Sequence, residues 1–153
     1  MPSIVPTRAI SFAIAGALLL AIFWPVLHPP NTTLHQAVLQ RQFRAIKAPA
    51  DAKVIYVDEK PKRGRVFIGG YYTSGLSFEQ LQHYYLPQLQ RTGWRQVAES
   101  PLLVSGRDFG GREITLCKSE YRSTLEYAGK DQNAGWTFAL TMSWDAKNEC
   151  TAK

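Results

Sequence analysis

The residues best placed for acid–base or metal chemistry are Glu79 and His83, which lie four positions apart in a predicted helix. That spacing puts both side chains on one face of the helix, one turn apart. A carboxylate and an imidazole so placed can share a proton or supply part of a metal site. They equally form an ordinary solvent-facing pair. Because the sequence suggests no third ligand, a small periplasmic hydrolase using His83 and Glu79 is only the alternative interpretation.

No motif of a known cofactor site occurs elsewhere in the chain. The sequence lacks a Gly-x-Ser-x-Gly nucleophile motif, a Walker loop, a dinucleotide fingerprint and a Cys-x-x-Cys pair. The glycine-rich run 106–111 has neither the lysine nor the strand-to-helix context of a phosphate-binding loop, so it predicts a hairpin loop. We therefore expect a protein that is not an enzyme and that holds no metal or cofactor.

Four cationic side chains surround one predicted turn and form the densest charge cluster of the chain: Lys60, Lys62, Arg63 and Arg65. Such a cluster suits anionic lipid headgroups, an acidic protein surface or nucleic acid, although a solvated turn has the same composition. No aromatic side chain is interleaved among the cations, which argues against nucleic acid. We therefore name these four residues as candidates for contact with anionic lipid or an acidic partner.

Two tyrosine pairs, Tyr71-Tyr72 and Tyr84-Tyr85, are the other candidate contact residues. Adjacent side chains point apart on a strand and about 100° apart on a helix, so each pair is expected to bury one ring and leave the other at the rim. An exposed tyrosine suits a binding surface because it offers a large area at little entropic cost. We assign this role to Tyr72 and Tyr84, with the edge of the core as the alternative.

The only two cysteines of the chain, Cys117 and Cys150, have no metal-ligating residues close to them in the sequence. Such a pair is more typical of one disulfide than of a metal site. Disulfides persist in oxidising compartments, so we place the domain outside the cytoplasm. Two unpaired buried cysteines in a cytosolic domain are the alternative.

An uncharged apolar run of nineteen residues, 9–27, dominates the N-terminal region. As a helix at ~1.5 Å per residue it is about 28 Å long, which matches the hydrocarbon core of a bilayer. The residues after it offer no small-x-small cleavage site. We therefore predict an uncleaved transmembrane anchor behind a short flank, 1–8, with a cleaved signal peptide and a buried soluble helix as alternatives.

The segment 28–48 follows the anchor and is predicted to hold a juxtamembrane helix over 31–48. Four apolar residues fall near one face of this helix: Leu34, Ala37, Val38 and Ile46. A linker helix leading into the following domain is the favoured interpretation. A stalk lying on the membrane surface is the other.

The segment 49–153 is predicted to fold as an extracytoplasmic domain, and its clearest element is a helix. A capping box of Ser77 and Gln80 begins the helix, and Gly93 ends it. Pro87 interrupts the pattern and predicts a kink. An apolar stripe at spacings of three and four runs along one face: Phe78, Leu81, Tyr85 and Leu89.

The rest of this domain alternates apolar and polar residues in short runs, which predicts strands. The runs are 53–57, 65–72, 94–100 with an extension to 104, 112–118, 121–127 and 136–144. We therefore predict an α+β fold in which one helix packs on an antiparallel sheet of five or six strands, after the N-terminal transmembrane helix. Ile114 and Leu116 would face the helix, which turns Cys117 away from it.

The stretch from Tyr72 to Trp94 resembles a pattern in small bacterial envelope proteins, many of them with a single span or a lipid anchor. The pattern is a strand ending in tyrosine, a serine-capped helix with Tyr-Tyr and leucine, and then Gly-Trp. A later Cys117-Lys118 and a final tryptophan-containing strand are also similar, whereas Pro87 departs from the pattern. The resemblance covers about residues 50–150. It implies an envelope location and this fold, and it supplies no catalytic residues because the family has no assigned activity.

Length and composition limit the classes of protein to which the chain can belong. A chain of 153 residues is too short for a multidomain enzyme, and two cysteines are too few for a disulfide-dense mini-protein. The prediction is a single-pass inner-membrane protein whose C-terminal domain lies in the periplasm. It binds a protein partner in the envelope, as an accessory subunit of an assembly or as an immunity-type binding protein, and it does not bind nucleic acid.

Overall fold

The computed structural model describes residues 32–61, 64–129, 134–145 and 148–150. The predicted flank and anchor, 1–8 and 9–27, lie outside these residues. Within the described part, no helix is both long and apolar enough to cross a bilayer.

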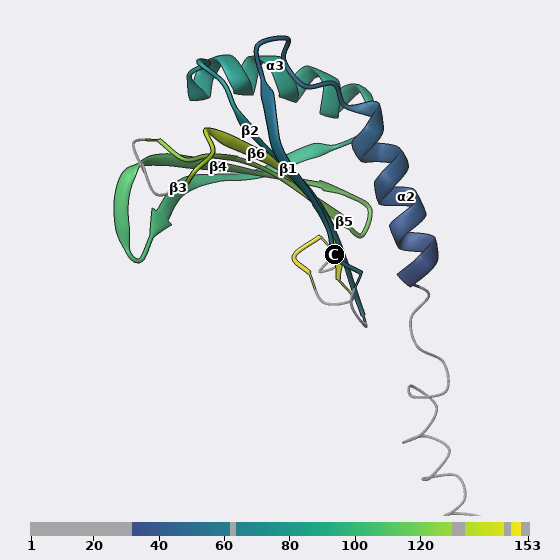
Figure 1. Cartoon of the computed structure of the whole chain (residues 1–153). Coiled ribbons are helices and arrows are strands. Elements are labelled where there is room, and N and C mark those ends of the chain that lie inside the picture. The colour runs from purple at the N-terminus through teal and green to yellow at the C-terminus, as the bar shows by residue number, and fades with distance from the viewer. Residues whose placement is uncertain (1–31, 62–63, 130–133, 146–147, 151–153) are drawn as a thin grey trace, which may run out of the picture. The chain divides into compact units, whose positions relative to one another are not determined.

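The described residues form two helices and six strands (Figure 1). The helices are α2 (Thr32–Ala45) and α3 (Phe78–Arg91). The strands are β1 (Lys53–Glu59), β2 (Arg65–Thr73), β3 (Arg95–Val104), β4 (Arg107–Lys118), β5 (Tyr121–Tyr127) and β6 (Phe138–Asp145). All neighbouring strands are antiparallel, in the order β1-β2-β6-β5-β4-β3, so β1 and β3 are the two edges. The predicted α+β class is confirmed, with two helices in place of one.

The six predicted strands are observed, and one predicted loop is not. The glycine-rich run 106–111 belongs almost entirely to β4, which begins at Arg107. The turn is reduced to Ser105 and Gly106, whose φ angles are 50° and 76°. Positive φ at both positions is the geometry of a tight two-residue hairpin. The residues after the turn are therefore free to pair with β3.

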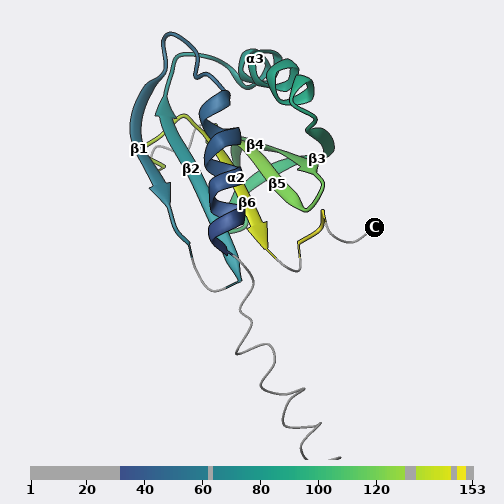
Figure 2. The same cartoon turned by 90° about the vertical axis from the view of Figure 1, so that its right-hand side faces the viewer.

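One face of the sheet carries the hydrophobic core and both helices (Figure 2). Strand β6 alternates as predicted, with its four large residues buried: Phe138, Leu140, Met142 and Trp144. The predicted stripe of α3 is also buried, and so are Ile114 and Leu116 of β4. No described helix covers the other face, which is named the open face here. It carries the alternate residues of each strand, such as Phe67, Thr124 and Thr141.

Helix α3 begins and ends as its sequence predicts. Ser77 accepts a hydrogen bond from the backbone N–H of Gln80, and the Gln80 side chain accepts one from the backbone N–H of Ser77 at 2.8 Å. At the other end Gly93 has a φ of 91°, and the N–H of Trp94 bonds back to the carbonyl of Leu89 at 3.1 Å. This left-handed ending satisfies carbonyls of the last turn. The helix continues through Pro87.

Helix α2 packs against the core of the sheet. Leu39 is fully buried in the core, whereas Leu34, expected on the apolar face, is 58% exposed. The ring of His35 stacks on Trp144 at 3.7 Å between centroids. The contacting stripe therefore runs from His35 through Leu39 to Phe43, at a spacing of four residues. The compact unit begins at Thr32 and therefore includes α2, whereas the expected domain begins at residue 49.

Candidate functional site

The predicted disulfide joins Cys117, near the end of β4, to Cys150 in the C-terminal segment, with Cα atoms 5.5 Å apart. Cys117 lies on the sheet face opposite the helices, as its place in the strand predicts. The bond links residues 33 positions apart. It therefore holds the C-terminal segment against the open side of the sheet.

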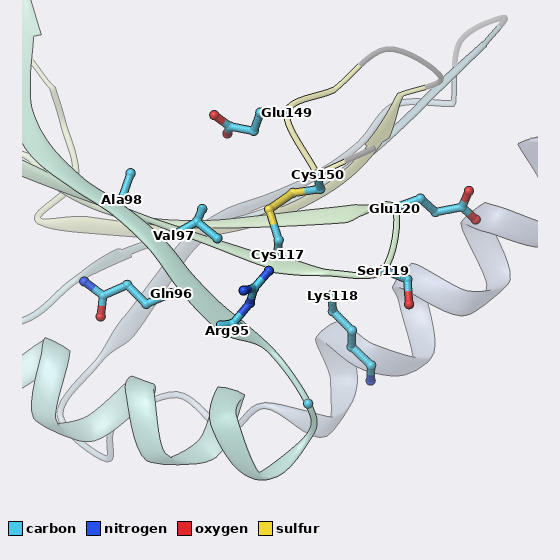
Figure 3. A pocket seen from close by; sticks show the side chains of 11 residues that line it. Arg95, Gln96, Val97, Ala98, Cys117, Lys118, Ser119, Glu120, Glu149 and Cys150 are labelled. Atoms are coloured by element: carbon cyan, nitrogen blue, oxygen red, sulfur yellow. A yellow bond between two sulfur atoms is a disulfide. The ribbon is translucent and has the colours of Figure 1, made fainter. Parts of the chain in front are cut away.

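An open cleft of about 1090 Å³ lies beside this disulfide (Figure 3). Its walls come from the start of β3, the β4–β5 turn and the C-terminal segment. Arg95 lies next to the disulfide, and Glu149 lies on the far side of the bond (Figure 3). Lys118 and Glu120 line the rim. Charged side chains of both signs therefore line the cleft, with Arg95 and Lys118 as the cations and Glu120 and Glu149 as the anions.

The structure describes only two residues of the predicted cationic cluster, Lys60 and Arg65. Each of them forms an ion pair with a carboxylate. Lys60 lies 2.7 Å from the Asp58 carboxylate, whose hydrogen bond raises the pKa of the Lys60 amine. Arg65 lies 2.8 Å from the Asp145 carboxylate. Lys62 and Arg63 lie outside the described residues. The two described cations therefore have acidic partners on their own surface, which weakens the case for lipid contact through them.

Each tyrosine pair buries one ring, as predicted. In the pair Tyr71-Tyr72, however, the buried ring is that of Tyr72, which was expected at the rim. Tyr72 is 7% exposed and stacks on Phe138 at 4.8 Å. Its ring lies across Gly70, where a β-carbon would collide with it. Tyr71 is the ring left at the rim, on the open face. The assignment of Tyr72 to a contact surface is therefore wrong, because its strand position points it into the core.

Tyr84 lies partly exposed on α3, while Tyr85 beside it is fully buried. The Tyr84 hydroxyl donates a hydrogen bond to the carbonyl of Ala48 at 3.0 Å. This bond ties α3 to the segment that follows α2. Tyr84 thus has a structural contact, and its exposed ring edge stays a predicted partner contact.

Glu79 and His83 lie on the exposed side of α3, where they line a shallow depression with Pro87. Backbone hydrogen bonding at the helix start and the Ser77 hydroxyl lower the pKa of Glu79. A lowered pKa suits a capping carboxylate and does not favour a general acid. Among the described residues, no group of three His, Cys, Asp or Glu side chains could hold a metal. The geometry gives the hydrolase interpretation no support.

The outer edge of β1 is the most exposed apolar surface of the described chain. Four successive side chains are between 46% and 59% exposed: Val54, Ile55, Tyr56 and Val57. These residues were expected to form a strand, but exposure depends on strand order. Because β1 is the end of the sheet, β2 is the only described strand that pairs with it. Sequence patterns alone contain no signal for that position.

The backbone of β1 presents unpaired groups outward. The N–H of Lys60 bonds to the carbonyl of Phe67 on β2 at 3.0 Å. Backbone groups alternate in direction along an antiparallel strand, so those of Val57 and Glu59 point away from β2. Tyr56 to Glu59 pair in regular register after an irregularity between Val54 and Tyr56. This regular stretch can accept another strand.

The open face carries a network of charged side chains. Glu113 and Glu126 are directly opposite each other on β4 and β5. Arg122 lies 3.2 Å from Glu113 and 3.1 Å from Glu149. Burial, and then the neighbouring Glu113, raise the pKa of the Glu126 carboxyl, while Arg122 acts in the opposite sense. The guanidinium therefore offsets the repulsion between the two carboxylates.

Next to this network, three aromatic rings form a shelf defined by Tyr56, Tyr71 and Trp136. Tyr56 stacks on Tyr71 at 4.3 Å between centroids, and Trp136 meets Tyr71 edge-on at 5.8 Å. Burial, followed by the Tyr56 hydroxyl and the carboxylate of Glu126, raises the pKa of Tyr71 to about 12. The Tyr71 hydroxyl therefore keeps its proton at physiological pH.

Known proteins do not identify the chain. No family model matches it, and no curated protein or solved structure matches it either.

Proposed function

We propose that this chain is a membrane-tethered interaction domain of the bacterial periplasm. It serves an envelope assembly as an accessory subunit, or acts as an immunity-type binding protein. The observation that supports this function most directly is the exposed apolar edge of β1. Soluble proteins usually blunt or cover such an edge because it pairs with other chains.

The location rests on two features of the chain. The uncharged run 9–27 is long enough to anchor it in a bilayer. The disulfide between Cys117 and Cys150 suits an oxidising compartment. A tethered domain meets membrane partners at high effective concentration, so a modest contact area is sufficient for binding.

The contact itself is addition of a strand to β1. An extended segment of the partner bonds to the outward backbone groups of Val57 and Glu59. Val57 lies on the helix side of the sheet opposite Gly70, and Tyr56 lies on the open face opposite Tyr71. A partner segment with apolar side chains on both faces therefore complements this edge. The irregularity near Ile55 limits the added strand to the stretch from Tyr56 onward.

Substitution of Val57 tests the proposal, because its N–H points away from β2. Val57→Pro removes one outward donor and leaves the β1–β2 ladder intact. Val57→Thr, the matched control, keeps the donor and the branched side chain. In pull-downs from membranes solubilised in mild detergent, we expect a stoichiometric companion with the wild type and Val57→Thr. We expect Val57→Pro to lose it.

The contrary results are equally clear. A companion that persists with Val57→Pro, in a chain shown to be folded by its near-UV circular dichroism, contradicts binding at this edge. Recovery of the wild type without any companion contradicts the subunit proposal as a whole.

A further inference from the structure

We propose that the open face binds an uncharged saccharide in a hollow above β5 and β6. The hollow has a volume of about 480 Å³ and is named the sheet cup here. Its lining includes three hydroxyl-bearing residues, Thr124, Thr141 and Ser143, and Phe67 lines one side. Glu126 lies on the other side. The size is within the range of small-molecule sites, about 300–1,000 Å³.

The floor is built by strand register. Thr124 is directly opposite Thr141, and Arg122 is opposite Ser143. Among the described residues, no group hydrogen-bonds to the hydroxyls of Thr124 or Thr141, which are 5% and 7% exposed as residues. A hydroxyl can donate one hydrogen bond and accept others. These two groups are therefore available to a ligand that also both donates and accepts.

The charges around the cup select a neutral ligand. Arg65 is paired with Asp145, and Arg122 is paired with Glu113 and Glu149. An anion would meet the carboxylates of these pairs, and a cation would meet the guanidinium groups. A polyol avoids both conflicts, because its hydroxyls donate to carboxylates and accept from guanidinium groups. This complementarity disfavours phosphate and nucleic acid as occupants.

The aromatic shelf of Tyr56, Tyr71 and Trp136 extends the cup along the same face. Tyr71 is opposite Ala139, and Ala139 is opposite Glu126, so the shelf and the cup are neighbours in the sheet. Sugar rings present one face of C–H groups, which packs on aromatic rings. A chain of two or more sugars can therefore place one ring in the cup and the next on the shelf. This inference is independent of the protein contact at β1.

The test uses the full chain in a zwitterionic detergent without sugar headgroups. Cellotetraose, maltotetraose and chitotetraose are the probes, followed by saturation-transfer NMR and calorimetry. We expect at least one of the three to bind. Thr141→Val removes one floor hydroxyl at nearly constant shape, and it should weaken binding about 3–10-fold. Trp136→Ala should also weaken binding, because it removes one ring of the aromatic shelf.

Ser100→Ala is the matched control, because this hydroxyl belongs to edge strand β3, outside the cup. It should leave the affinity unchanged. The proposal is overturned if none of the three saccharides binds. It is also overturned if both Thr141→Val and Trp136→Ala, checked for folding by near-UV circular dichroism, bind as the wild type does. Displacement of the sugar by inorganic phosphate would show an anion site instead.

Discussion

The two faces of the sheet differ in how they use the same strands. On the helix-covered face the strand residues are large and apolar, and they pack with Leu39 of α2 and the stripe of α3. On the open face the corresponding positions carry threonines, paired charges and a shelf of aromatic rings. Strand β6 shows the division within one segment, since Phe138, Leu140 and Met142 alternate with Ala139 and Thr141. The difference indicates that most of the apolar burial lies on the covered face, whereas the open face presents polar and aromatic side chains that can contact another molecule.

The two edge strands of the sheet, β1 and β3, also differ from each other. Edge strand β3 contains Pro101 and two register irregularities, features that obstruct pairing with another strand. Edge strand β1 has one irregularity, near Ile55, and no proline. Its exposed side chains are apolar in four successive positions, 54–57. The contrast explains why we assign the partner to β1.

The covered face should give the largest effect on stability. Phe138 is fully buried and contacts Tyr72 and Tyr85 through its ring. Phe138→Ala should lower the free energy of unfolding by about 3–5 kcal/mol, because it leaves a cavity in the core. Thr141→Val, on the opposite side of the same strand, should change it by less than about 1 kcal/mol. Urea denaturation measures both, and equal effects would contradict the division between the faces.

Loss of the disulfide should have the next largest effect on the free energy of unfolding. Replacing Cys117 and Cys150 by serine together should lower the free energy of unfolding by about 2–4 kcal/mol, because the unfolded chain is no longer constrained. The same denaturation curves apply, with reduced wild-type protein as the control. A double variant as stable as the oxidised wild type would show that the bond contributes nothing to this domain.

Substitution of Glu126 should have the smallest effect on the free energy of unfolding, and this effect should depend on pH. Its raised pKa means that the folded state holds this proton more tightly than the unfolded state does. Stability therefore falls as pH rises from the ordinary glutamate pKa through the raised one, and the loss persists above it. Glu126→Gln should be more stable than the wild type at neutral pH by at most about 1 kcal/mol.

At a pH below about 4, where both states hold the proton, the Glu126→Gln difference should disappear. Glu59→Gln on the exposed β1 strand is the control. A wild type that gains stability relative to Glu126→Gln as pH rises would reverse the assigned sign.

Local patterns predicted most of the fold, because the relevant interactions are close in sequence. The capping box at Ser77 and the alternation from Phe138 to Trp144 define their elements without distant contacts. The strand order was not predictable in this way. It depends on pairing such as Val66 with Trp144, which are far apart in the chain.

The predictions that were wrong also concern features that depend on contacts between residues far apart in the chain. Helix α2 packs through His35, a residue that an apolar pattern does not count, so the stripe chosen around Leu34 was wrong. Tyr72 faces the core because β2 is an inner strand with a helix above it. The candidate sites depend on strand neighbours even more. The β1 edge, the sheet cup and the aromatic shelf exist only once the order of the strands is known.

Addition of a partner strand to β1 is the central feature of the proposed function. Site-specific photocrosslinking in living cells tests this directly, with the crosslinker at position 57 of β1 and, for comparison, at position 103 of β3. We predict a discrete crosslinked protein from position 57 and none from position 103. Equal crosslinking from both edges, or none from position 57 in a chain recovered intact in the membrane, would contradict it.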